Sequence, residues 1–430
     1  MDRFVESKSG KFMLVLLAGL IAFSLFASVL PSPVKSLGTP SASVGVTISA
    51  FEPGIIDTSI VKNSSTDYEM WFSHLKGISS LTTLLSDMRG ILTDNLVNAI
   101  IAQDIPALLT ALSNVDAAAL YSFLVNLQPV IGYATSTDGL SWTVVNDNVL
   151  AGDLGGAFDF AGTPYVIKNS AADYQMWYAR STQNVNQAQV WSILSNLGGN
   201  TTAKLNAINT LSQYGATAIA YATSTDGQAW TKVNNAVITP VLSEGSYRPV
   251  FAPSVVRNAS NDLEIWYTEL IPGSTQAELT SALDAIGQLG RNEWDTFTRI
   301  STRIKHASSD NPINAWTGAA VCLTGNTTLL HDSVGSPSVT KHTNGYDMFF
   351  QRGTSNVTAV ATMAAADRIS AWGLVDIWTD LKNANYTGVL TKFTNMVDSN
   401  AEFSASLNAF SNTRTTVAYA TSPDGTTWTL

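Results

Sequence analysis

Apolar and polar residues alternate in short runs that recur along the chain and divide it into four units. The first half of a unit holds two β-branched and aromatic runs joined by Asn, Ser or Asp, as in residues 58–63 and 67–72. The second half carries Asp-Gly and Trp, as in residues 132–143. Such runs, joined by turn residues, predict β-hairpins, so each unit predicts a four-stranded antiparallel sheet. The units cover residues of about 46–150, 151–240, 241–330 and 331–430.

Both faces of these predicted sheets are apolar. Side chains alternate along a strand, so Tyr68, Met70 and Phe72 point to one face and Trp71 points to the other. A sheet with two apolar faces must be covered on both sides, and radially stacked four-stranded blades provide that cover. The pattern therefore predicts an all-β core, a β-propeller with four detected blades. Either four blades close alone, a fifth degenerate blade is hidden, or a partner supplies one, and residues 44–49 are one candidate to complete the last sheet.

Between the two hairpins of each unit, the spacing of apolar residues changes to that of a helix, as in Leu81, Leu84, Leu85 and Met88. Each insertion joins the second strand of a blade to its third. We therefore expect all four on one side of the sheets, packed together as a helical cap. The predicted insertions cover residues of about 74–128, 182–214, 271–300 and 354–412.

An uncharged apolar run of 19 residues at 12–30 follows three basic residues and precedes a Pro- and Ser-rich linker at 31–45. This order is typical of an export signal, and the run is close to the ~20 residues that span a bilayer. No small-x-small cleavage site stands at its end. We expect an uncleaved membrane anchor with residues 1–11 in the cytoplasm and the propeller at 46–430 outside, at the cell surface. A cleaved signal and a secreted protein are the alternative.

Charged residues make up only 13% of the 430, and the net charge is −10. Because the chain has no basic cluster to neutralise phosphates, we do not expect nucleic-acid binding. The single cysteine, Cys322, excludes internal disulfides and a cysteine-built zinc site, and is interpreted as a small buried hydrophobe. The four histidines lack metal-ligand spacing and no nucleotide-binding fingerprint is present, so no metal and no cofactor are expected.

The repeated Ser-x-Asp-Gly-x-x-Trp-Thr turns, such as Ser136 to Thr143, place hydroxyl and carboxylate oxygens close together. Calcium or a sugar could use such oxygens. The simpler interpretation is structural: the Asp caps its own turn, the Gly supplies a positive φ, and the Trp packs under the neighbouring sheet. We expect the structural role.

The strand and turn motifs resemble a known repeat. Pro-Ser-Val-Val at 253–256, Tyr-x-Met-Trp-Tyr at 174–178 and Ala-Thr-Ser-x-Asp-Gly-x-x-Trp-Thr at 222–231 carry the resemblance. They are similar to the repeats of bacterial extracytoplasmic propellers related to glycoside hydrolase families 32 and 43, the five-bladed arabinanase-like fold. The resemblance covers the hairpins, roughly half of the chain, and leaves the helical insertions unexplained.

The resemblance implies hydrolysis of glycosidic bonds by carboxylates at the pocket end of the innermost strands. One carboxylate activates water or attacks carbon, a second donates a proton, and a third orients the sugar. The family's usual Asp-Pro at the start of the strand is missing, since Asp57 is followed by Thr58. The acids at the corresponding places in this chain are Asp57, Asp159, Glu244 and Asp332.

Three functional hypotheses follow. The first is a glycan hydrolase whose acids line a pocket under the helical cap. The second is a non-catalytic surface module that binds glycans through exposed aromatic and acidic side chains. The third is a surface structural protein that binds a protein partner through the helical cap.

Overall fold

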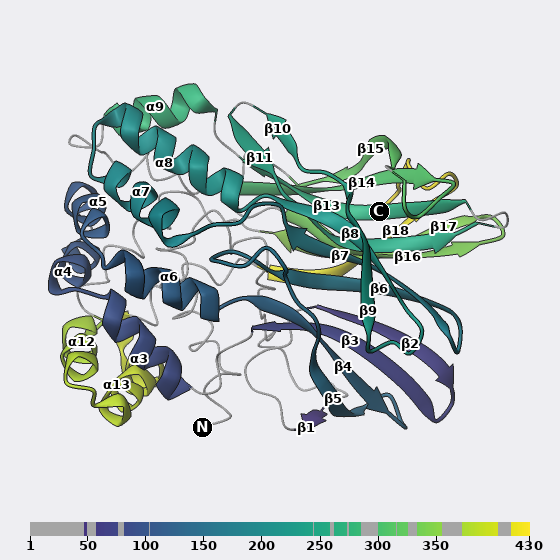
Figure 1. The fold of residues 1–430 in the computed structure, drawn as a ribbon, viewed down its shortest axis with the longest axis horizontal. Helices are drawn as coiled ribbons and strands as arrows, with labels where there is room; N and C mark the ends of the chain where they lie inside the picture. Colours follow the sequence, from purple (N-terminus) through teal and green to yellow (C-terminus); the bar gives the residue numbers. More distant parts are fainter. Residues whose placement is uncertain are drawn as a thin grey trace.

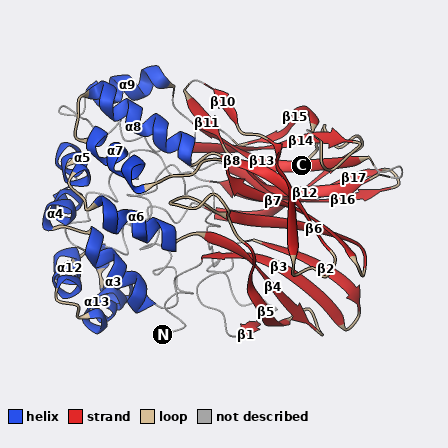
Figure 2. Cartoon of the chain, in the orientation of Figure 1, coloured by secondary structure: helices blue, strands red, loops and turns tan. Residues whose placement is uncertain are grey.

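The strands and helices of the computed structural model occupy opposite sides of the molecule (Figure 2). The predicted membrane anchor at 12–30 and the flanking residues 1–11 and 31–45 lie outside the described residues. The structure describes residues 47–49, 57–75, 81–102, 104–243, 245–258, 262–272, 275–284, 300–314, 316–325, 333–354, 372–402 and 414–430.

Among the described residues, four sheets of three or more strands follow one another along the chain, and the repeat strands within each pair antiparallel with their neighbours in sequence. Four antiparallel sheets in the predicted order are therefore confirmed, although the described part of sheet 4 has three strands where four were predicted. Sheet 1 contains β2 (Thr58–Ser64), β3 (Asp67–Leu75), β4 (Pro129–Ser136) and β5 (Ser141–Leu150). Sheet 2 contains β6 (Ala161–Ser170), β7 (Asp173–Ser181), β8 (Thr217–Ser224) and β9 (Trp230–Ile238). Sheet 3 contains β12 (Val250–Arg257), β13 (Leu263–Pro272), β14 (Ile300–Ser309) and β15 (Thr317–Thr324).

Sheet 4 contains β16 (Ser333–His342), β17 (Gly345–Thr354) and β18 (Arg414–Ser422). Thr429 bridges to Thr421 beside β18, at the place of the fourth strand. The expectation that residues 44–49 complete this sheet is wrong. β1 (Thr47–Ser49) instead pairs parallel with β5 of sheet 1, because a short β-branched run can pair with any open strand edge. A short hairpin of β10 (Val241–Ser243) and β11 (Ser246–Arg248), which the repeat pattern did not predict, precedes sheet 3.

Apolar cores form between successive sheets, which explains why the strands are apolar on both faces. Trp71, Trp177 and Trp266 occupy the same position in the second strand of sheets 1, 2 and 3, and each is fully buried. Each indole packs in the core shared with the next sheet. Within the described part of the chain, no such core joins sheet 4 back to sheet 1.

The helices lie between the second and third strands of their sheets, as predicted, and together on one side of the strands (Figure 1). Polar caps fix their starts. The Asp116 carboxylate accepts the backbone N–H groups of Ala118 and Ala119 at the start of α6, and Asn186 forms a capping box with Gln189 at the start of α7. The helices are α3 (Leu81–Ile91), α4 (Asp94–Ala102), α5 (Ile105–Ser113), α6 (Ala117–Asn126), α7 (Gln187–Leu197), α8 (Thr201–Tyr214), α9 (Gln276–Asp284), α12 (Leu374–Lys382) and α13 (Tyr386–Ser399).

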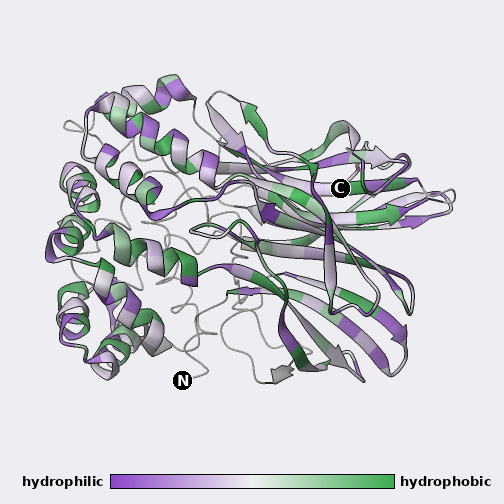
Figure 3. Ribbon diagram, viewed as in Figure 1, coloured by the Kyte–Doolittle hydropathy of each residue, from purple (hydrophilic) through white to green (hydrophobic). Residues whose placement is uncertain are grey.

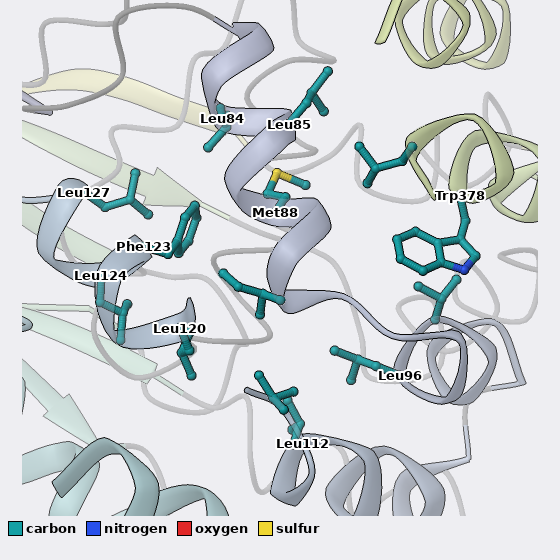
Figure 4. Packing of buried hydrophobic residues seen from close by; sticks show 14 of the residues in the cluster. Leu84, Leu85, Met88, Leu96, Leu112, Leu120, Phe123, Leu124, Leu127 and Trp378 are labelled. Carbon is teal, nitrogen blue, oxygen red and sulfur yellow. The ribbon is translucent and has the colours of Figure 1, made fainter. Parts of the chain in front are cut away.

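Helices from separate insertions share one apolar core, so they pack on one another as a cap. Leu85, Met88 and Phe123 of the first insertion and Trp378 of the last belong to this core (Figure 4). The Trp378 indole N–H donates to the Asp94 carboxylate at 2.6 Å, which ties α12 to α4. Figure 3 shows apolar and polar residues interspersed along the helices and strands, as the sequence pattern requires.

No single helix among the described residues combines the length and the apolar composition that crossing a membrane demands. One bent pair, Pro106–Ser113 with Ala117–Asn126 at 87°, meets that test only when both helices are taken together.

Candidate functional site

The candidate site is the end of the sheets that faces the helices. The second strand of each sheet runs into the helical layer, and the first strand pairs antiparallel with it. The first residues of β2 and β6 therefore lie at the helix-facing end. This places two of the four predicted acids, Asp57 and Asp159, at the ends of adjacent first strands. Glu244 and Asp332, the other two, lie outside the described residues.

Asp57 combines partial burial with a perturbed carboxyl. Its backbone carbonyl accepts the N–H of Ser73 on β3 at 2.9 Å, which fixes the start of β2 against the end of β3. Its side chain is half-buried, and burial raises the pKa of its carboxyl to about 6 from an ordinary value of 3.8. Desolvation, which penalises the charged form, is the cause of this shift. A carboxyl with this pKa can hold a proton in slightly acidic solution and can give it up.

Asp159 caps its own loop. The side chain is buried, and its Oδ2 accepts the backbone N–H of Gly155 at 2.7 Å. A Cβ placed on Gly152 would lie 2.0 Å from Asp159 Oδ1, so a side chain at this position would have to displace the carboxylate. Oδ1 has no hydrogen-bond partner among the described residues. One carboxylate oxygen of Asp159 is thus used for structure.

Exchanging Gly152 for alanine is expected to lower the free energy of unfolding by about 1–3 kcal/mol, because the new methyl group displaces the Asp159 carboxylate from Gly155. Urea denaturation of the purified protein measures this loss. In an Asp159→Ala background the same exchange should cost much less. If the cost of Gly152→Ala is equal in both backgrounds, the contact with Asp159 is not its cause.

Ser73 links the ends of the two strands. Its hydroxyl oxygen accepts the N–H of Thr163 on β6 at 2.7 Å, while its own N–H donates to Asp57. Thr163 has a φ of 49°, at the point where the pairing of β6 with β7 shifts register. The structure therefore places the ends of β2 and β6 next to each other. Within the described part of the chain, no hydrogen bond joins the Asp57 carboxylate to that of Asp159.

A cationic group that the sequence analysis did not identify lies at the same end of sheet 2. Arg180 on β7 is buried, and its Nη2 lies 2.6 Å from Asp153 Oδ1. Lys232 Nζ lies 3.2 Å from the other oxygen of Asp153. Arg180 Nη1 has no partner among the described residues, and neither does the hydroxyl of the buried Tyr178 two residues earlier on the same strand. These donors suit a polar, hydroxyl-rich or anionic ligand.

Sheet 3 carries a buried acid at the corresponding place. Glu269 on β13 is buried, and it pairs with Lys305 Nζ at 3.2 Å and with the guanidinium of Arg303. Two cations compensate its charge, so it is a structural acid in this arrangement. A repeat signal could have located these groups. The position three residues after the repeat Trp or Phe holds an ionisable residue in an apolar strand of all four units: His74, Arg180, Glu269 and Arg352.

The Asp-Gly turns at the opposite end of the sheets are structural, as expected. Asp138 Oδ1 accepts the N–H groups of Leu140 and Ser141, both at 2.7 Å, and these bonds lower its pKa to about 2. Gly139 has a φ of 72°. In the next unit, Gly227 offers its carbonyl to the Trp71 indole of sheet 1 at 2.7 Å, and Trp230 packs edge-on against Trp71. These turns lock one sheet onto the next.

Among the described residues, no group of three or more His, Cys, Asp or Glu side chains is arranged to hold a metal ion. Cys322 is half-buried, and burial raises the pKa of its thiol to about 12. A thiol with this pKa is protonated at neutral pH and is a poor nucleophile.

No protein-family model and no curated protein sequence matches the chain. Several solved structures do match. The family 43 endo-arabinanase of Bacillus licheniformis is 11% identical, with a TM-score of 0.36 over 73% of this chain and 69% of the other. The α-L-arabinanase of Cellvibrio cellulosa, complexed with arabinohexaose, is 9% identical, with a TM-score of 0.32 over 70% of each chain. The β-1,2-mannobiose phosphorylase of Listeria innocua is 11% identical, with a TM-score of 0.37 over 70% and 69%.

The solved structures include glycoside hydrolases of family 43, one of the two families that the repeat motifs resemble.

Proposed function

We propose that this protein is a cell-surface β-propeller that acts on carbohydrate at the helix-facing ends of its first strands, with Asp57 as the proton donor. The proposal rests on the repeat motifs, which resemble those of glycosidase propellers, and on the state of one carboxyl. Asp57 stands directly before the first strand of sheet 1, and its pKa is raised to about 6. That carboxyl is the observation that carries the proposal.

The propeller arrangement is part of the proposal. Four sheets of consecutive antiparallel strands follow one another, and each of the first three buries an indole against the next. Radial stacking of four-stranded sheets buries the facing sides of successive sheets against each other in this way. The helical cap covers the end of the sheets where the first strands begin (Figure 1).

The proposed placement outside the cell, anchored by residues 12–30, rests on the apolar run behind basic residues. It agrees with the composition of the chain. Charged residues make up only 13% of the chain, and the single cysteine needs no reducing compartment.

Proton donation explains why the pKa of Asp57 matters. Cleavage of a glycosidic bond requires an acid that protonates the leaving oxygen, and a raised pKa keeps a carboxyl available for this step. A neighbouring carboxylate would have to activate the water or attack the sugar. Asp159, which precedes the first strand of the next sheet, is the other predicted acid that the structure describes. One of its oxygens already accepts the N–H of Gly155.

The test is sugar release from arabinan-, fructan- and mannan-type polysaccharides by the full chain. We expect Asp57→Asn to reduce the rate by about 10²–10⁴-fold, because the amide cannot donate a proton of comparable acidity. The rate of the unmodified protein should fall as the pH rises through about 6, where the Asp57 carboxyl of the folded protein loses its proton.

The matched control is Asp67→Asn, which makes the same change at an exposed acid, the first residue of β3, at the opposite end of sheet 1. It should leave the rate unchanged. Unaltered release by Asp57→Asn would exclude Asp57 as the proton donor.

The second candidate function is glycan binding without cleavage, and the state of Asp159 favours it. A carboxylate that caps its own loop is poorly placed to act as the second catalytic acid. This function predicts saturable binding of a polysaccharide by calorimetry with no product released at any pH. Product release would exclude it.

A further inference from the structure

One interface recurs between the successive sheets, and its apolar part follows a simple rule. An aliphatic residue and an aromatic residue on the third strand of one sheet are buried together with an aliphatic residue on the first strand of the next. On the third strands, these are Ile131 with Tyr133, Ile219 with Tyr221, and Ile304 with His306, all at most 9% exposed. On the first strands, they are Val166, Val255 and Val339, all at most 6% exposed.

The polar part of the interface recurs at fixed positions as well. An acidic or amide side chain on the second strand of one sheet meets a basic side chain on the first strand of the next. Glu69 lies 2.7 Å from Lys168 between sheets 1 and 2. Gln175 accepts from Arg257 at 2.7 Å between sheets 2 and 3. Glu264 lies 3.9 Å from Lys341 between sheets 3 and 4.

A backbone bond accompanies these pairs at the first and third interfaces. The N–H of Val166 donates to the hydroxyl of Ser59 at 2.9 Å, and the N–H of Val339 donates to the hydroxyl of Ser254 at 3.0 Å. Each interface therefore has a donor half, carried by a first strand, and an acceptor half, carried by the preceding sheet.

Sheet 4 presents an acceptor half to solvent. Val417 and Tyr419 stand at the repeat positions of Ile304 and His306, yet they are 79% and 47% exposed. Phe349, at the position of Trp266, is 53% exposed. The acid of this half is Asp347, which bonds to Tyr419 and His342 of its own sheet.

Sheet 1 presents the first strand of a donor half to solvent. Ile60 stands at the position of Val166, Val255 and Val339, but it is 54% exposed. Lys62, at the position of the interface bases, is exposed and lies over the ring of Tyr68, 5.4 Å from its centroid. Lys168 and Lys341 lie over Tyr174 and Tyr346 in the same way, so Lys62 already has the geometry of an interface base.

We propose that a second copy of this chain docks the first strand of its sheet 1 on the exposed face of sheet 4, repeating the interface between sheets. Lys62 of one copy then pairs with Asp347 of the other, and Ile60 lies against Val417. The N–H of Ile60 donates to the hydroxyl of Ser338, which is exposed while its counterparts Ser59 and Ser254 are buried. The two faces differ, so the contact is head-to-tail and every copy has one face of each kind.

Charge complementarity and continuity with the interfaces inside the chain are the reasons to choose a second copy as the occupant. The acidic face offers a carboxylate, the basic face offers an ammonium group, and both belong to this sequence. Three internal interfaces bury equivalent residues, so the two exposed faces match halves of an interface that this chain already forms between its own sheets.

The association of the full chain, purified in detergent, can be followed by sedimentation over a range of concentrations. We expect assemblies larger than the monomer for the unmodified protein, and monomers for Val417→Asp and for Ile60→Asp, each with at least a tenfold weaker association. The matched control is Val375→Asp on α12, where the valine is 54% exposed in the helical layer. It should associate like the unmodified protein.

Mixing the two defective variants separates a lost face from a lost fold. A Val417→Asp copy retains the sheet 1 face and an Ile60→Asp copy retains the sheet 4 face, so their mixture should form dimers although each alone is monomeric. Misfolded variants could not complement one another. Monomers of the unmodified protein at every concentration, or no dimers in the mixture, would overturn the proposal.

Cross-linking distinguishes a second copy from closure within one chain. Ile60→Cys and Val417→Cys are introduced separately and together in a Cys322→Ala background, so that no other thiol is present. Oxidation of the mixed single variants should give a disulfide-linked dimer, and the double variant should give a ladder of higher species. A disulfide formed only within one chain would contradict docking of a second copy.

Discussion

Replacing Trp266 with alanine is expected to lower the free energy of unfolding by about 3–5 kcal/mol. The indole is fully buried between sheets 3 and 4, and its N–H donates to the Gly425 carbonyl at 2.8 Å. Its ring contacts His306 at a centroid distance of 4.9 Å and Tyr346 at 5.4 Å. Alanine leaves a large cavity and removes a bond between two sheets, and both effects destabilise the fold in the same direction.

The control for this exchange is Phe349→Ala at the same repeat position of sheet 4. More than half of this side chain is exposed, so its removal should cost less than about 1 kcal/mol in dilute, monomeric protein. Chemical denaturation of both variants gives the comparison. Equal losses at the two positions would mean that the face of sheet 4 is covered in the monomer.

The local elements of this fold could be predicted from the sequence because their signals are local. Asp138 and Gly139 define a turn by their own chemistry, and the structure has the Asp capping that turn. The helical spacing of Leu84, Leu85 and Met88 likewise indicates which residues face inward, and α3 buries these three side chains. The positions of all four insertions between second and third strands follow from the order of such signals.

Pairing between distant segments could not be predicted in the same way. Residues 44–49 were expected beside the last sheet, while β1 at Thr47–Ser49 joins sheet 1, because a short strand carries little information about its partner. The hairpin of β10 and β11 is equally short and lies outside the repeat.

The candidate site was predictable only in part, for a physical reason. The starts of the first strands indicated Asp57 and Asp159. The raised pKa of Asp57 and the loop cap formed by Asp159 both depend on how the folded chain packs around each carboxyl. Asp159 caps its loop because Gly152 leaves room for the carboxylate. Arg180 became part of the site because β5 and β6 are joined by a loop that brings Asp153 to it. Neither contact has a spacing that sequence alone reveals.

Asp57→Asn is expected to stabilise the protein at neutral pH. The carboxyl has a pKa of about 6 in the folded protein against an ordinary value of 3.8, so the folded state favours its protonated form. As the pH rises from about 4 to 6, the unfolded chain has lost this proton while the folded chain retains it, and the stability of the unmodified protein falls. The loss amounts to about 3 kcal/mol above pH 6, at 1.36 kcal/mol per pH unit. Asparagine remains neutral and avoids it.

A carboxyl that serves as a proton donor needs a raised pKa, and the desolvation that raises the pKa lowers the stability of the folded protein. The Asp57→Asn variant should therefore be more stable than the unmodified protein at neutral pH and should lack the proton donor. Asp67→Asn, at an exposed acid of the same sheet, should show neither effect.

The most direct test of the account is the free energy of unfolding of the unmodified protein and of Asp57→Asn, measured by urea denaturation at pH 4 and at pH 7.5. Other titrating groups are common to both proteins and cancel in the difference. We predict that the difference shifts by about 2–2.5 kcal/mol in favour of Asp57→Asn between the two pH values. A difference that is the same at both pH values would show that the Asp57 carboxyl titrates as it does in the unfolded chain, and would contradict its role as a proton donor with a raised pKa.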